Sequence, residues 1–299
     1  MGWTKTSLGA SVGALVIAMS AMNWGWGIPA HSQALFYSPY PDATLLKAQS
    51  AQLASDAIRL AQFGRIAEAL NRARLAVQLD PTAPELWLIL GSLQLESRAF
   101  SEAVTTLQEA RQRDPQNANI LFTLGEALMR NQQYPEAIEV LEAGLAIKND
   151  DPNGFFQLGN AYLLQGDLAA ARKQFMAAIA LSNTFWPAIN NLGLVDYEQG
   201  DLTAAMANFE AAMALDETMA EPRLALATVL FIKGRVSEAE QLGIKALQLD
   251  PSYGDLETLR INLWGSRLLQ DAQVFLQRPR IREALFQARL SRQEQGEGL

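Results

Sequence analysis

The chain has 299 residues, of which 49% are hydrophobic, and it carries no Cys, one His (His31) and a formal net charge of −8. That hydrophobic content suffices for a sizeable core, but without thiols the chain lacks the groups for cysteine zinc sites, iron–sulfur clusters and thiolate catalysis, and His31 is its only imidazole. Because an acidic surface repels phosphate backbones, we expect no nucleic-acid partner.

Residues 1–34 have the layout of an export signal. Lys5 precedes an uncharged apolar run, 8–22, and small residues stand at the −3 and −1 positions of a cleavage site after Ala34. Stretched to 8–28, the run just reaches the roughly 20 residues that span a bilayer, so an uncleaved membrane anchor is the alternative. Both interpretations leave Lys5 in the cytosol and export the remainder, to a periplasm or a compartment of the thylakoid-lumen type.

Residues 35–49, which contain Pro39 and Pro41, are expected to form an extended linker. From residue 50 to residue 253 the same residue types then return every 34 positions, six times and without an insertion. A Leu-Gly pair recurs at Leu90-Gly91, Leu124-Gly125, Leu158-Gly159 and Leu192-Gly193. Twelve positions after the glycine place, every repeat has an alanine: Ala69, Ala103, Ala137, Ala171, Ala205 and Ala239. Small residues at such spacing let two antiparallel helices approach closely.

Proline placement supports a helical interpretation independently of the repeat. Five prolines fall in predicted first helical turns, where the missing N–H costs nothing: Pro84, Pro135, Pro152, Pro187 and Pro222. No segment of the chain shows the alternation of apolar and polar residues that is typical of β-strands.

This pattern resembles the tetratricopeptide repeat (TPR), in which each unit is a helix, a tight turn and a second helix. The resemblance assigns six repeats: 50–83, 84–117, 118–151, 152–185, 186–219 and 220–253. It implies an all-α fold, a right-handed superhelical solenoid, in which each repeat buries its apolar face only against its neighbours.

Residues 254–299 are expected to cover the end of the solenoid. Leu256, Leu259, Leu263 and Trp264 lie at helical spacing and predict a capping helix over 255–276, and a final short helix follows Pro279. Segment 260–299 carries seven Arg against four acidic residues. This basic segment is a candidate for contact with anionic lipid or an acidic partner, and the alternative is an ordinary charged helix face.

In TPR proteins of this type, positions 2, 5, 6, 9 and 12 of each repeat line a concave groove that binds other proteins. Transferred by register, these positions predict a partner-binding site in repeats two to five, with emphasis on three to five: Leu88, Asn119, Phe122, Glu126, Met129, Asn153, Phe156, Asn160, Leu163, Asn190 and Asn191. Amides bond a peptide backbone, and Phe and Met supply apolar contacts, so the mixture suits a peptide or helix of another protein. The alternative is that Phe122 and Phe156 belong to the inter-repeat core and that the Asn side chains are solvated.

Other kinds of site are not expected. The carboxylate-clamp class of TPR, which holds acidic tails, needs basic groove residues, whereas position 5 here carries Ala54, Leu88, Phe122, Phe156, Asn190 and Leu224. Residues 149–154 resemble the start of a calcium-binding EF-hand loop, but its twelfth position is Asn160 instead of Glu. Since no phosphate loop, nucleophile elbow or metal triad is present, we expect no metal, no cofactor and no enzymatic activity.

These observations together predict a protein–protein interaction scaffold or adaptor that binds a partner segment in the groove. The export signal suggests an assembly factor for a membrane-associated complex, with membrane association through residues 8–28 or the basic C-terminus. The alternatives are a self-associating structural component and a regulatory subunit of an envelope or export enzyme.

Overall fold

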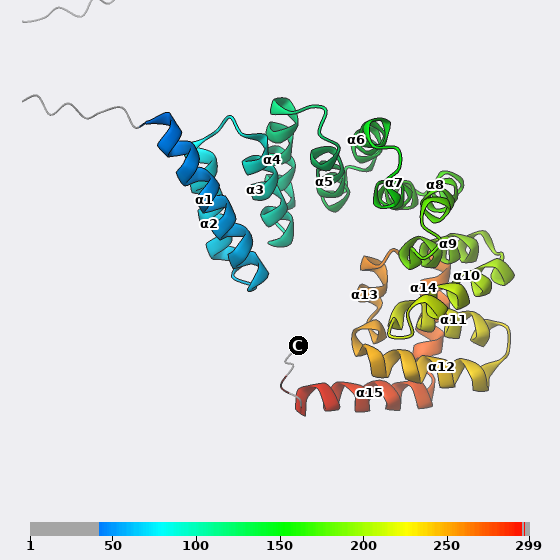
Figure 1. Ribbon diagram of the computed structural model, residues 1–299. Helices are drawn as coiled ribbons and strands as arrows, with labels where there is room; N and C mark the ends of the chain where they lie inside the picture. The colour runs from blue at the N-terminus through cyan, green and yellow to red at the C-terminus, as the bar shows by residue number, and fades with distance from the viewer. Residues whose placement is uncertain (1–41, 295, 297–299) are drawn as a thin grey trace, which may run out of the picture. The chain divides into compact units, whose positions relative to one another are not determined.

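The computed structural model describes residues 42–294 and residue 296 (Figure 1). The predicted export signal or anchor, 1–34, lies outside the described residues, and so do residues 35–41 of the predicted linker. Within the described part, all secondary structure is helical. No helix there is both long enough and apolar enough to span a bilayer.

Twelve helices form six consecutive antiparallel pairs, as the period of 34 predicts, and each pair packs against the next. Their bounds are α1 (Ala43–Gln62), α2 (Ile66–Leu79), α3 (Pro84–Glu96), α4 (Phe100–Arg113), α5 (Ala118–Arg130), α6 (Tyr134–Ile147), α7 (Pro152–Gln165), α8 (Leu168–Leu181), α9 (Trp186–Gln199), α10 (Leu202–Leu215), α11 (Ala220–Ile232) and α12 (Val236–Leu249). The architecture is an all-α helical solenoid. All five prolines singled out above lie in first turns.

The first pair begins earlier than the repeat pattern indicates. Residues 43–49, predicted as linker, are the first turns of α1, because the Asp42 side chain accepts a hydrogen bond from the Thr44 amide at 2.8 Å and caps the helix. No proline follows Pro41 before the repeat, so the helix continues without a break into residue 50.

Glycine on the first helix and a large side chain on the second hold each central pair together. A Cβ built on Gly91, Gly125, Gly159 or Gly193 would come within 2.5–2.6 Å of Leu107, Leu141, Phe175 or Phe209, respectively, each sixteen residues further on. The outer repeats have alanine at the glycine place, and the residues sixteen positions on are the small Ala73 and Gly243. In the four central repeats, therefore, a large side chain on the second helix requires glycine on the first, and we call this the volume rule.

The turn inside each repeat places one residue in the left-handed region. Its φ is +71° at Gly64, +91° at Gly166, +89° at Gly200 and +78° at Gly234, and it is 63° at both Arg98 and Gln132. The chain thus adopts the same helix-ending geometry six times, even where the residue is not glycine.

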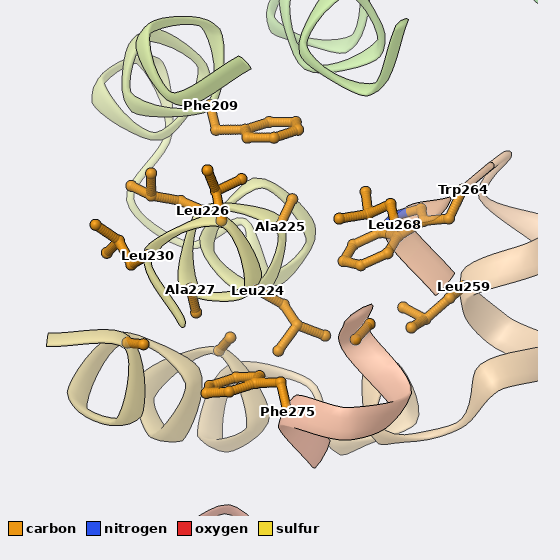
Figure 2. Packing of buried hydrophobic residues seen from close by; sticks show 14 of the residues in the cluster. Phe209, Leu224, Ala225, Leu226, Ala227, Leu230, Leu259, Trp264, Leu268 and Phe275 are labelled. Atoms are coloured by element: carbon orange, nitrogen blue, oxygen red, sulfur yellow. The ribbon is translucent and has the colours of Figure 1, made fainter. Parts of the chain in front are cut away.

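The C-terminal segment differs from the single capping helix that its spacing predicts. It consists of a short 3₁₀ turn η1 (Pro251–Gly254), α13 (Leu256–Ile261), α14 (Ser266–Leu276) and α15 (Pro279–Glu294). The predicted helix is interrupted at Leu263, whose φ is 65°. Helix α14 packs against α11 and α9, and α15 packs against α12. Figure 2 shows Trp264, Leu268 and Phe275 of this segment beside Leu224 and Ala225 of α11.

Replacing the central glycine of repeat four tests the volume rule. We expect Gly159→Ala to lower the free energy of unfolding by about 1–3 kcal/mol, because Phe175 is fully buried and has no room to move away from a new methyl group. Urea titration followed by circular dichroism measures this. Gln165→Ala, at an exposed position of the same helix, is the control; equal stability of the two variants contradicts the rule.

Candidate functional site

The first helices of repeats one and two border an open apolar hollow. Its volume is about 490 Å³ and it is lined by residues of α1 and α3: Ile58, Ala61, Gln62, Leu88, Ile89, Ser92, Leu93 and Glu96. Ile58 and Ala61 hold positions 9 and 12 of repeat one, and Leu88, Ile89 and Ser92 hold positions 5, 6 and 9 of repeat two. The hollow therefore lies on the face that the register assigns to the groove, here called the groove face.

The groove face of repeats three and four is partly open. Asn119 and Asn153 are exposed, and Asn119 borders a second, more polar depression with Asn117 and Lys148. Glu126, Met129 and Leu163 are half-buried, and Glu126 stands 4.0 Å from Arg130. These side chains present amide, carboxylate and apolar groups to the solvent on neighbouring repeats.

Phe122 is not on the open surface. Its side chain is 7% exposed, and its ring fills the space that two glycines leave: a Cβ on Gly144 or on Gly154 would come within 2.7–2.8 Å of it. The ring therefore turns from the groove position into the core between repeats three and four. This agrees with the alternative interpretation of Phe122 as an inter-repeat core residue.

Phe156 is half-buried in an aromatic cluster. Its ring centroid lies 6.0 Å from that of Phe175 and 5.5 Å from that of Phe185, the latter at an edge-to-face angle of 86°. Such pairs stabilise packing beyond the area they bury. Both partners belong to repeat four, so these contacts hold Phe156 within its own repeat while part of its surface stays accessible.

The amides of repeats four and five form a polar chain along the first helices. Asn191 donates to Asn160 at 2.8 Å, and Asn190 donates to Asn191 at 3.2 Å and to Glu221 at 3.1 Å. Asn190 and Asn191 are both buried, with exposed fractions of 1% and 7%. They bond one another and the repeats on either side, so the structure does not place them at an open surface as the register predicts.

The chain's own C-terminal segment covers the groove face of repeats five and six. Trp264, 3% exposed, donates its indole N–H to Glu221 at 3.1 Å, and the Tyr197 hydroxyl donates to Asp271 at 2.6 Å. The Glu198 carboxylate accepts the amides of Arg267 and Leu268, the first turn of α14. Positions 12 of repeat five and 2 of repeat six are therefore already occupied.

Part of the basic C-terminus is engaged inside the fold. Arg278 and Arg280 donate to the buried Glu240 of α12 at 2.9 and 3.1 Å. Arg267 lies over the Tyr197 ring at 5.5 Å. These contacts fasten the C-terminal helices to repeats five and six, a role that the excess of Arg alone did not indicate.

Glu221 is a buried carboxyl whose hydrogen-bond partners are all neutral. It accepts hydrogen bonds from Trp264, Asn190 and Tyr253, and these bonds lower its pKa. Burial has the larger, opposite effect and raises the pKa to about 7. The Oδ1 atom of Asn190 is buried and has no partner within the described residues. Burial therefore shifts this carboxyl toward its protonated form at the junction between α11, α9 and the C-terminal segment.

Sequence reasoning missed Ile58, Ala61 and Ile89, which line the hollow, and the covering of repeats five and six. The same register that selected Leu88 assigns these residues to the groove, and large apolar side chains at positions 6 and 9 were the available signal. No comparable signal in the chain shows where α14 docks. Among the described residues, no three acidic or His side chains gather as metal ligands would.

Three family models described as "Tetratricopeptide repeat" match the chain, over residues 94–155 and 196–263, 55–118, and 153–185. PilW, described as a widely conserved type IV pilus biogenesis factor, aligns with TM-score 0.63 at 19% identity, over 71% of this chain and 98% of PilW. PilF of Pseudomonas aeruginosa aligns with TM-score 0.60 at 18% identity, over 72% of this chain and 97% of PilF.

A third similar structure, MamA from Desulfovibrio magneticus RS-1 beginning at its residue 41, aligns with TM-score 0.52 at 22% identity, over 56% of this chain and 96% of that one. At such identities, the likeness shows a shared fold. A comparison with curated protein sequences finds no match.

The pKa of Glu221 predicts a specific dependence of stability on pH. Since its pKa is about 7 in the folded chain and about 4.5 when exposed, the folded state binds the extra proton, and stability is full below pH 4.5 and falls as the pH rises to 7. Relative to Glu221→Gln, we expect the wild type to lose about 2–3 kcal/mol between pH 4.5 and 8. Urea unfolding of both proteins across this range measures the difference, and parallel curves would contradict the assignment.

Proposed function

Because the chain belongs to the tetratricopeptide-repeat family, we propose that it is a scaffold that holds a segment of another protein on the groove face of repeats one to four. Its family and fold are those of protein-interaction scaffolds. The observation that carries the proposal is a contrast along one face: the hollow between α1 and α3 is open and apolar, whereas the corresponding face of repeats five and six is covered by α14.

The chemistry of the open face suits a peptide or helix. Ile58 is 45% exposed and Leu88 and Ile89 are half-buried, so binding would remove apolar surface from water. Asn119 and Asn153 are exposed further along the face and can donate to and accept from a main chain. The face thus combines an apolar anchor site with hydrogen-bonding groups, the usual composition of a protein-binding surface.

The sequence of the N-terminus supports a more specific role. The charged start, the apolar run 8–22 and the small residues before Ala34 suit export, with cleavage there or anchoring through 8–28. In this proposal, the exported solenoid assists assembly of a membrane-associated complex by holding one of its subunits.

Co-purification with a groove-face variant tests the proposal. We expect tagged full-length protein from detergent-solubilised native membranes to recover partners that Ile58→Glu loses, because the charge would lie in the hollow. Met176→Glu is the matched control, since Met176 is a comparably exposed apolar side chain, at 54%, on the second helix α8.

The outcomes separate the alternatives, provided that circular dichroism shows both variants to be folded. Equal recovery by Ile58→Glu and wild type contradicts binding at the groove face. Recovery of the chain alone by all three proteins supports a self-associating component instead.

A further inference from the structure

We propose that an amphipathic α-helix of a partner protein docks in the hollow between α1 and α3, as the chain's own α14 packs against α9 and α11. This inference rests on the proposed function and specifies the partner segment. It is carried by the repeat itself, because α1 and α3 stand four repeats before α9 and α11 in the register. Within this chain, a helix, α14, is therefore already bound to the equivalent face of repeats five and six.

The residues of the two faces correspond one to one. Ile58 corresponds to Leu194, Leu88 to Leu224 and Ser92 to Thr228, so apolar and small hydroxyl side chains recur at the same places. On the C-terminal face, Leu194, Leu224 and Thr228 are at most 1% exposed. On the N-terminal face, Ile58 is 45% exposed and Ser92 is exposed. At these three places the N-terminal face has the same kinds of side chain as the C-terminal face, but no helix in the described part of the chain lies over it.

Helix α14 shows how a helix sits on this face. It presents Leu268, Ala272 and Phe275, all fully buried, at helical spacing toward α9, α11 and α12. Its first turn is held by the Glu198 carboxylate, which accepts the Leu268 amide at 2.9 Å. A carboxylate from α9 thus satisfies amides that the first turn of a helix leaves without intrahelical partners.

Two of the differences between the faces bear on how a helix from outside would bind to the N-terminal one. Ala61 stands where Tyr197 stands in repeat five, so the large ring that bonds Asp271 of α14 is replaced by a methyl group. Gln62 stands where Glu198 stands, and its amide oxygen is an acceptor that can serve the first turn of an incoming helix. Both residues line the hollow.

A helix satisfies the chemistry of this hollow better than an extended strand does. Its polar side chains are those of Gln62, Ser92 and Glu96, and the Ser92 hydroxyl already donates to the Leu88 carbonyl. An extended segment would bring unpaired N–H and C=O groups against apolar side chains, which is costly, whereas a helix bonds these groups internally.

Charge indicates the polar edge of that helix. Glu96 lines the hollow, and residues 42–253 carry 26 acidic and 16 basic side chains, a formal charge of −10. The partner helix is therefore expected to carry apolar residues at positions i, i+4 and i+7, the spacing of Leu268, Ala272 and Phe275, with Lys or Arg beside them.

Selection from two display libraries tests the inference on the full chain purified in mild detergent. One library randomises the surface of a single helix on a small three-helix scaffold, and the other displays linear 12-residue peptides. Binders are then measured against Ser92→Trp, which fills the hollow from an exposed position, and against Ser101→Trp, the same change at an exposed position of α4 outside the hollow. Ile58→Glu serves as a second hollow variant, and circular dichroism verifies folding.

We expect the helix library to yield binders that Ser92→Trp and Ile58→Glu weaken by roughly tenfold or more and that Ser101→Trp leaves unchanged. Binding only by linear peptides that tolerate a central proline, with loss in Ser92→Trp, overturns the helix inference and leaves the proposed function standing. Sedimentation that shows self-association abolished by Ser92→Trp makes a second copy the occupant and also overturns it. Binders indifferent to both hollow variants, or none from either library, overturn the inference, whereas the proposed function is overturned only if Ile58→Glu also recovers the native partners in the co-purification.

Discussion

The close approach of two helices at one glycine is the contact on which the rest of the structure depends. Where Gly91, Gly125, Gly159 and Gly193 face Leu107, Leu141, Phe175 and Phe209, a side chain of the second helix rests on the backbone of the first. The contact recurs in the four central repeats and brings the two helices of each pair equally close there. Because each pair also packs against the next, the first helices form one continuous face rather than separate surfaces.

At the C-terminal end of the solenoid, a glycine again faces a large side chain, but this side chain comes from α14, outside the repeats. Gly243, which stands where a large side chain would reach the first helix, instead receives Phe275 of α14, whose ring lies 2.6 Å from the position of an added Cβ. Helix α14 then extends over α11 and α9, where Trp264 and Glu198 hold it. By accommodating Phe275, Gly243 thus helps to position the same helix that caps the solenoid and covers the groove face.

The two ends of the groove face consequently differ in what covers them. Around Glu221, neutral donors surround a carboxyl whose pKa burial raises, so the covered end is held by a proton-sensitive polar junction as well as by apolar packing. At the uncovered end, Ile58 and Ser92 stay accessible because no segment in the described part of the chain lies over α1 and α3. The open apolar part of the groove face therefore lies in the first repeats.

The sequence by itself determined the all-α solenoid and its six helix pairs, because each repeat packs against neighbours that are near in the chain. Only the tertiary structure decided which of the predicted groove positions are open. Phe122 turns inward because Gly144 and Gly154 leave space for its ring, and Tyr197 is covered because α14 folds back over it and Asp271, 74 positions later, accepts its hydroxyl. Such burial depends on side-chain volumes of distant segments, which no periodic pattern records.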